Sequence, residues 1–251
     1  MEQELKGHSA IVTGGAQGIG LAIAVELACR GANVAICDVN EKGLIEAAAQ
    51  IAEKTGSRVF VKVVDIAKKA LIDAFVADVE KEFGGIQILV NNAGIHPLHP
   101  IEEISEEEWD LVMAVNLKAM FLFCKAVLPG MRKQKYGRII NLSSEAGKHG
   151  GTVAACSYAA SKGGVLAFGR NLAQQTGADG ITVNNICPGR IVTAMANAAG
   201  VEANKKFIEN SILKRIGDPE DVAFAAAYLA SPRAGFITGE SMMVNGGTMR
   251  D

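Results

Sequence analysis

The segment SAIVTGGAQGIG, residues 9–20, is an apolar run of strand length that passes directly into a glycine-rich turn. Its glycines at positions 14, 18 and 20 follow the spacing G-x-x-x-G-x-G, a relative of the dinucleotide-binding pattern G-x-G-x-x-G. Without a Cβ, the turn can be tight and the backbone can approach a pyrophosphate, which the first N–H groups of the next helix then bind. Because it stands between a strand and a helix, the segment predicts a nucleotide-binding turn rather than an ordinary glycine turn.

Short runs rich in Val and Ile alternate with Ala- and Leu-rich stretches along the rest of the chain. The predicted strands are Ser9–Thr13, Asn33–Val39, Arg58–Val64, Gln87–Asn91, Gly137–Ser143, Ile181–Cys187 and Ser241–Val244. The predicted helices are Gly18–Arg30, Lys42–Lys54, Lys68–Phe83, Glu106–Met131, Tyr158–Thr176 and Glu220–Ala230. The strand runs are nearly continuously apolar, so we expect them to be buried on both faces. The alternation predicts an α/β, Rossmann-like, doubly wound fold with a mainly parallel seven-stranded sheet, in one domain over residues 1–251.

Composition excludes several classes of protein. The 251 residues are 49% apolar and 21% charged, which is typical of a globular chain, and the net charge of −2 lacks the basic excess of a nucleic-acid or membrane binder. We find no secretory signal at the N-terminus and no apolar run that approaches a bilayer span of about 20 residues. Five scattered cysteines and four histidines without ligand spacing indicate a reduced, cytoplasmic protein that holds no metal.

Asp38 ends the second predicted strand, 18 residues beyond Gly20. A carboxylate at this point can accept hydrogen bonds from both hydroxyls of an adenosine ribose and would repel a 2′-phosphate. Gln17 is neutral, and the first turn holds no Arg or Lys that could bind such a phosphate. The sequence therefore predicts NAD as the cofactor rather than NADP.

Tyr158 and Lys162 stand four residues apart in a predicted helix, which puts them on one face. Tyrosine has an ordinary pKa near 10 and is a poor base at neutral pH. A nearby ammonium and an oxidised nicotinamide would both favour the phenolate and lower that pKa. The pair alone is a weak indication of a catalytic site, and the motifs around it strengthen the prediction.

Several motifs occur in a fixed order, and together they resemble the classical short-chain dehydrogenase/reductase family over essentially the whole chain. They are Thr13–Gly20, Asn91-Asn92-Ala93-Gly94, Asn116, Ser143-Ser144, the pair Tyr158 and Lys162, and Pro188-Gly189. The resemblance implies metal-independent hydride transfer between a nicotinamide and a carbinol or carbonyl carbon, in which the cofactor carries the hydride.

The resemblance implies catalytic roles for four residues. Tyr158 is the expected general acid/base, and Ser144 is the expected donor to the substrate oxygen. Lys162 is expected to bind the nicotinamide ribose and to lower the pKa of Tyr158, and Asn116 is expected to position a water in the proton relay. The implied cofactor-binding residues are Gly14, Gln17, Gly18, Ile19, Gly20, Asp38, Asp65, Ile66, Asn92, Ala93, Gly94, Tyr158, Lys162, Pro188, Gly189, Ile191 and Thr193.

One spacing departs from the family pattern, because Ser144 precedes Tyr158 by 14 residues, one more than is common. We choose Ser144 over Ser143 because it fits the pattern Ser-x-x-Gly, and the extra residue puts the shape of the pocket wall in doubt. The candidate substrate residues are Glu145, His96, His149 and Arg190. If Glu145, His96 and His149 converge, the pocket suits a polyhydroxylated substrate.

Two further expectations concern mobility and assembly. Residues 194–213 occupy the place of the family's substrate lid and are expected to form one or two helices that close over the site. Met120, Phe121, Phe123 and Phe168 read first as core residues, although they stand on the helices that the family uses for subunit packing. The resemblance implies a homotetramer.

The substrate is left open by the sequence. The first interpretation is an NAD-dependent dehydrogenase of a sugar, polyol or other small secondary alcohol. The alternatives are a 3-oxoacyl-(carrier protein or CoA) reductase, a hydroxysteroid dehydrogenase and, in another class, a non-catalytic NAD-sensing protein. For a carrier substrate, Arg132, Lys133, Lys135 and Arg138 could supply a basic patch at the rim of the site, whereas Asp179 argues against such docking.

Overall fold

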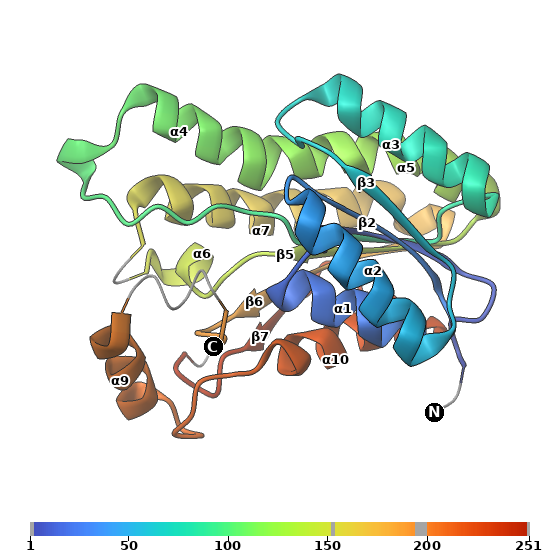
Figure 1. Cartoon of the computed structure of the whole chain (residues 1–251). Helices are drawn as coiled ribbons and strands as arrows, with labels where there is room; N and C mark the ends of the chain where they lie inside the picture. Colours follow the sequence, from blue (N-terminus) through green and yellow to red (C-terminus); the bar gives the residue numbers. More distant parts are fainter. Residues whose placement is uncertain (1–2, 152–153, 194–199, 250–251) are drawn as a thin grey trace.

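A computed structural model describes residues 3–151, 154–193 and 200–249 of the chain. Its centre is a single sheet of seven parallel strands in the order β3-β2-β1-β4-β5-β6-β7 (Figure 1). The strands are β1 (Ser9–Thr13), β2 (Asn33–Asp38), β3 (Val59–Val63), β4 (Ile88–Asn91), β5 (Gly137–Leu142), β6 (Ile181–Pro188) and β7 (Ser241–Val244). Strand order reverses between β1 and β4, as in a doubly wound fold, so the predicted fold class is confirmed.

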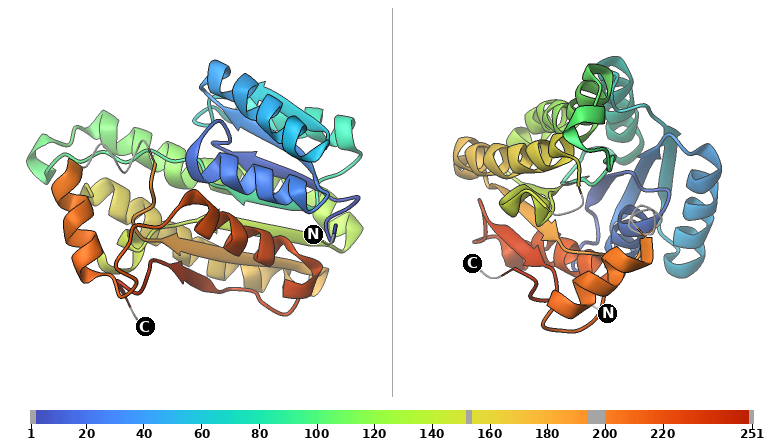
Figure 2. Two further views of the ribbon diagram at one scale, coloured as in Figure 1. Left: turned by 60° about the horizontal axis from the view of Figure 1, so that its bottom comes forward. Right: turned by 90° about the vertical axis from the view of Figure 1, so that its left-hand side faces the viewer.

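Helices cover both faces of the sheet, and each face has its own apolar core. One layer holds α1 (Gly18–Cys29), α2 (Glu41–Thr55) and α10 (Pro219–Ala230), and the other holds α3 (Lys69–Phe83), α4 (Glu106–Met113), α5 (Ala119–Gln134) and α7 (Cys156–Thr176). Two shorter helices, α6 (Ala146–His149) and α9 (Gly200–Asn210), lie at the same end of the molecule (Figures 1 and 2). Short η segments cover Ile101–Glu103, Ala114–Lys118, Gly177–Asp179 and Pro232–Ala234.

The strand order corrects one expectation from the sequence. Strand β3 is at the edge of the sheet, and Val61 and Val63 are 37% and 47% exposed instead of buried. β-branched residues favour a strand at an edge as well as in the centre, so composition alone does not distinguish the two positions. Met120 and Phe123 are buried, as expected of core residues, whereas Phe121 is exposed.

The predicted helix Glu106–Met131 is interrupted in the structure. A π-helical turn, η2 (Ala114–Lys118), separates α4 from α5, and α5 continues to Gln134. By length and composition, the combined helix is long and apolar enough to cross a membrane, although its sequence contains no uninterrupted apolar run of that length. In this structure Phe123, Val127 and Met131 are buried in the core against the sheet.

Two predicted helix starts differ in how they are capped. Ser105 accepts a hydrogen bond from the Glu108 N–H at 3.1 Å, but the Glu108 carboxylate bonds His99 instead of closing the capping box. Asp218 forms a complete box with Asp221 at the start of α10.

A row of polar side chains crosses the buried middle of the sheet. Asn91 donates to Asn141 at 2.9 Å, Asn141 donates to Asn185 at 3.2 Å, and Asn185 donates to Ser241 at 3.3 Å. These four residues are direct partners in the registers of β4, β5, β6 and β7. The row fixes the relative register of these strands, because a slip would leave buried amides without partners.

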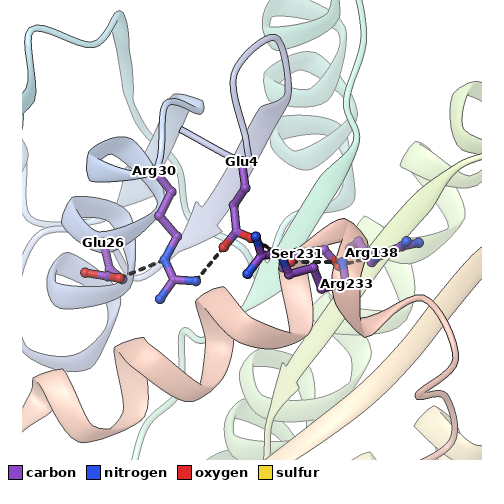
Figure 3. A network of polar contacts seen from close by, with 6 residues as sticks. All are labelled: Glu4, Glu26, Arg30, Arg138, Ser231 and Arg233. Atoms are coloured by element: carbon purple, nitrogen blue, oxygen red, sulfur yellow. Dashed lines mark hydrogen bonds and ion pairs between the residues drawn. The ribbon is translucent and has the colours of Figure 1, made fainter. Parts of the chain in front are cut away.

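A second polar network joins the amino-terminal segment to the residues that follow α10 and to the start of β5 (Figure 3). Glu4 accepts from Arg30 at 2.7 Å and from Ser231 at 3.1 Å, while Arg30 also bonds Glu26 at 2.8 Å. The carbonyl of Ser231 accepts from the buried Arg138 at 3.4 Å. This network lies at the start of β5, at the end of the strand opposite Ser144.

Candidate active site

The glycine turn packs too closely against its neighbours to carry a side chain at Gly14 or Gly20. Gly14 has φ +67°, and a Cβ on it would lie 2.9 Å from both Ala93 Cα and Asn92 Nδ2. A Cβ on Gly20 would lie 2.1 Å from the carbonyl oxygen of Gly14. The turn opens onto the first residues of α1, so it forms a backbone cradle of the kind that accommodates a pyrophosphate.

The start of the β4 loop is bonded to this turn. Thr13 Oγ1 accepts from the N–H groups of Asn92 and Ala93, each at 3.0 Å. Asn92 Nδ2 donates to the carbonyls of Thr13 at 2.9 Å and Gly14 at 3.2 Å. Asn92 thus stands beside the expected cofactor position, and its observed contacts hold the turn in shape.

Asp38 lies at the end of β2, next to the glycine turn. Its carboxylate accepts from the N–H of Ala16 at 3.3 Å and from that of Asn40 at 3.1 Å. Asp65, in contrast, accepts from the N–H of Ala67 at 3.0 Å and pairs with Lys68 at 3.2 Å. Asp38 therefore lies beside the glycine turn and its role toward a ribose stays a prediction, whereas the observed contacts of Asp65 are local.

The loop after β6 returns to the glycine turn. The methyl group of Thr193 lies 3.4 Å from where a Cβ on Gly18 would be. Gly189 donates its N–H to Val244 at 3.0 Å, and Ile191 forms an isolated bridge with Gly217. The structure thus brings the end of the Pro188–Thr193 segment to the predicted cofactor cradle.

Tyr158 and Lys162 come from the first turns of α7. Lys162 is 4% exposed, its Nζ donates to the Leu142 carbonyl at 2.7 Å, and it lies 5.7 Å from the centroid of the Tyr158 ring. Burial lowers the pKa of Lys162 to about 8. The lysine thus lies under the phenol at the end of β5.

The acidity of Tyr158 differs from the expectation. Burial raises the pKa of Tyr158 above its ordinary value, and a side-chain hydrogen bond with Ser144 opposes that rise. The ammonium of Lys162, whose Nζ is bonded to Leu142 and lies 5.7 Å from the centroid of the Tyr158 ring, does not offset this effect of burial. The protein alone favours the neutral phenol.

The two adjacent serines have different surroundings. Ser143 is buried and donates to the Lys162 carbonyl at 2.8 Å, which joins the end of β5 to α7. Ser144 is half-buried, bonds the Tyr158 side chain and accepts from the Ala146 N–H at 3.1 Å. The choice of Ser144 over Ser143 agrees with this geometry.

Asn116 lies in the π-helical turn, and such turns are frequent at functional sites. Its Nδ2 donates to the Ile95 carbonyl at 2.9 Å and to Ser161 at 3.1 Å, and its Oδ1 accepts from the Ile95 N–H at 2.8 Å. Both donor positions of the amide are therefore used to join the β4 loop to α7. Its expected contact to a relay water stays a prediction.

The four candidate substrate residues have different surroundings. The His96 ring packs edge-to-face against Tyr158, with centroids 4.3 Å apart. The Glu145 carboxylate accepts from Thr248 at 2.7 Å, while His149 is exposed and its Nδ1 accepts from the Gly151 N–H at 3.0 Å. Arg190 donates to Asn204 on α9. The structure therefore brings His96 to the phenol, whereas His149 is exposed and bonds within its own loop.

Other parts of the site were not predicted from sequence. Ser161 and Thr248 each bond a predicted site residue, yet a single hydroxyl residue carries no recognisable spacing. The expected lid falls partly on residues 194–199, which lie outside the described residues, and α9 forms the part that follows. In the described ranges, no group of three His, Cys, Asp or Glu side chains is placed to hold a metal ion.

Comparison with known proteins agrees with this architecture. The sequence model of the family described as enoyl-(acyl carrier protein) reductase matches residues 14–249. The 3-oxoacyl-[acyl-carrier-protein] reductases FabG of Vibrio cholerae and Chlamydia muridarum are 41% and 39% identical to this chain, over 97% and 98% of it and 98% and 99% of their own lengths.

Two solved structures are similar over nearly the whole fold. A putative short-chain alcohol dehydrogenase from Sinorhizobium meliloti has a TM-score of 0.93 and 34% identity, covering 99% of this chain and 98% of its own. Levodione reductase has a TM-score of 0.93 and 33% identity, covering 96% and 97%. Together with the motifs and the sheet order, these matches show that this chain belongs to the short-chain dehydrogenase/reductase family and is an oxidoreductase acting on CH–OH groups.

Proposed function

We propose that this protein transfers a hydride between NAD(H) and the C3 carbon of a 3-oxoacyl or 3-hydroxyacyl thioester. The observation that carries the reaction is the contact of Ser144 with Tyr158 above the buried Lys162. The substrate class is supported by the names of the relatives, which favour the thioester alternative over a sugar or polyol. The exposed position of His149 also removes part of the polar pocket on which the polyol interpretation depended.

The side chains supply binding and proton transfer. When bound, the nicotinamide supplies or accepts the hydride. In reduction, Ser144 donates a hydrogen bond to the C3 carbonyl oxygen, and Tyr158 gives that oxygen its proton as C3 becomes a carbinol. The positive charge of Lys162 stabilises the resulting phenolate until solvent returns a proton.

The proposed preference for NAD rests on Asp38. Its half-buried carboxylate stands beside the N–H of Ala16 in the glycine turn, where a 2′-phosphate would meet a negative charge. Exposed Val39 follows it and offers no cation.

The basic residues that were considered as a docking patch do not indicate binding of a carrier protein. Arg132 and Lys135 both pair with Asp179, at 3.1 Å and 2.7 Å, and Arg138 is only 5% exposed. Arg138 stands near the start of β5 whereas Ser144 follows its end, so these basic residues lie away from the rim of the site. We therefore propose that a coenzyme A thioester is accepted without a carrier.

We also propose a homotetramer. Trp109, Leu111 and Phe121, on α4 and α5, are 39%, 51% and 43% exposed, so both helices present large apolar side chains to solvent. Subunit contacts would remove these side chains from water. Light scattering that gives the mass of one chain would contradict this proposal.

The function is tested by following reduced-nicotinamide absorbance with acetoacetyl-CoA and either NADH or NADPH. We expect turnover with NADH, and a loss of about 10²- to 10⁴-fold in Tyr158→Phe while cofactor binding is retained. Polyols, sugars, steroids and cyclic diketones serve as competing substrates. Efficient turnover of one of these with none of the thioester would disprove the proposed substrate class.

A further inference from the structure

The fold holds His96 in one place beside the catalytic phenol. On one side, both the N–H and the carbonyl of Ile95 bond Asn116, at 2.8 Å and 2.9 Å. On the other side, the carbonyl of Pro97 accepts from the N–H of Ala155, just before α7, at 3.2 Å. Because the backbone is bonded on both sides, the position of the His96 ring is set by the same elements that position Tyr158.

The ring of His96 has a contact with Tyr158 but no hydrogen-bond partner among the residues described. Its plane is inclined at 67° to the phenol ring, with 4.3 Å between centroids. By comparison, His99 bonds Glu108 and His149 bonds Gly151 through their Nδ1 atoms. The half-buried imidazole of His96 therefore keeps its polar atoms available to a ligand beside the reacting group.

The charges around His96 define what it can bind. Burial lowers its pKa, and the nearby positive charges of Lys162 and Arg190 lower it further. At neutral pH the ring is therefore neutral and offers one N–H donor and one acceptor. With two cations nearby, the local potential favours an electron-rich oxygen rather than a cationic group.

We infer that His96 is a specificity-determining residue that donates a hydrogen bond to a second oxygen of the substrate, next to the carbonyl held by Ser144 and Tyr158. This inference rests on the proposed function, in which the second oxygen is the thioester carbonyl two carbons from C3. A substrate with a single oxygen has nothing to place against His96.

The experiment compares two variants in the same loop. His96→Phe keeps an aromatic ring against Tyr158 but has no nitrogen, and His99→Phe is the matched control on an exposed ring three residues away. For acetoacetyl-CoA we expect His96→Phe to lower kcat/KM about tenfold, mainly through KM, and His99→Phe to leave it within twofold. His96→Gln, which restores an N–H donor, is expected to recover part of the loss.

A ketone pair separates substrate binding from positioning of Tyr158. We expect His96→Phe to weaken turnover of 2,2-dimethylcyclohexane-1,3-dione, which cannot form an enolate between its carbonyls, but not of 2,2-dimethylcyclohexanone. Equal losses in kcat on both ketones would mean that His96 only positions the phenol, and would overturn the inference.

Binding provides a test that does not depend on turnover. Calorimetry of acetoacetyl-CoA and of 2,2-dimethylcyclohexane-1,3-dione with the NAD⁺-bound protein should show about tenfold weaker binding in His96→Phe, and equal affinities would overturn the inference. If the native protein reduces this dione and not the thioester, the proposed substrate class fails while the inference on His96 is still decided by the dione and 2,2-dimethylcyclohexanone.

Discussion

Thr248 donates its hydroxyl to the carboxylate of Glu145 across 2.7 Å, although 103 residues separate them in the chain. The main chain of Glu145 is held as well, because its N–H donates to the Pro188 carbonyl at 3.0 Å. The loop that carries Ser144 is therefore fixed by the ends of both β6 and β7. The position of Ser144 therefore depends on contacts with residues far away in the sequence.

Replacing Thr248 by Val removes this donor and leaves the shape of the side chain nearly unchanged. Because the bond reaches a carboxylate at a half-buried site, we expect the free energy of unfolding to fall by about 1 kcal/mol. We expect kcat/KM to fall severalfold through a looser Ser144 loop. Urea unfolding and steady-state kinetics measure both effects, and Thr248→Ser is the control that should retain them. Unchanged kinetics in Thr248→Val would show that the contact does not order the site.

Burial of Lys162 makes a prediction about the pH dependence of stability. Its pKa falls from 10.5 to about 8 in the folded chain, so between those values the unfolded chain binds more protons than the folded one. The free energy of unfolding of the cofactor-free protein should therefore rise from pH 8 to pH 10.5, by up to about 3 kcal/mol from this group. Below pH 8 Lys162 is charged in both states, so burial of its charge lowers the free energy of unfolding by the full amount.

The control for this prediction is Lys162→Met, which has no titrating group at that position. Urea unfolding of both proteins at pH 7, 8.5 and 10 gives the contribution of Lys162 as a difference, because other titrating groups cancel. Parallel pH dependences in the two proteins would contradict the prediction.

The cofactor preference should respond to the charge at the end of β2. Asp38→Ala combined with Val39→Arg removes the repelling carboxylate and adds a cation at an exposed position. We expect the ratio of kcat/KM for NAD to that for NADP to fall at least tenfold, since the arginine can pair with a 2′-phosphate. Val39→Arg alone should give a smaller change. A native protein that already prefers NADP would refute the proposed role of Asp38.

The buried row of asparagines should contribute strongly to stability. Asn141 is fully buried and bonds both Asn91 and Asn185, so Asn141→Ala leaves two buried groups without their partner. We expect the free energy of unfolding to fall by about 2–4 kcal/mol. The control is Asn171→Ala, which removes an exposed bond to Gln175 on α7 and should have little effect. A loss below 1 kcal/mol in chemical denaturation would mean that the row is not required.

Local chemistry made much of the site predictable. A tight turn that tolerates no Cβ at Gly14 and Gly20 is recognisable from the spacing of its glycines. Tyr158 and Lys162 are recognisable as a pair because they are one helical turn apart and lie on the same face. The choice between Ser143 and Ser144 also followed from a local pattern. A contact such as that of Thr248 with Glu145 cannot be predicted in this way, because no local sequence pattern near either residue indicates its partner.

By itself, the sequence determined the order of strands and helices along the chain and the parallel sheet, and it predicted the reacting groups, because these depend on periodicity and on spacings within one element or turn. Only the tertiary structure decided that β3 is an edge strand, that Asn116 lies in a π-helical turn and that His96, rather than His149, contacts the phenol. Burial and electrostatic environment arise from packing between distant segments. The pKa of Tyr158, raised here by the burial that the fold imposes, is therefore a property of the folded chain and not of its motif.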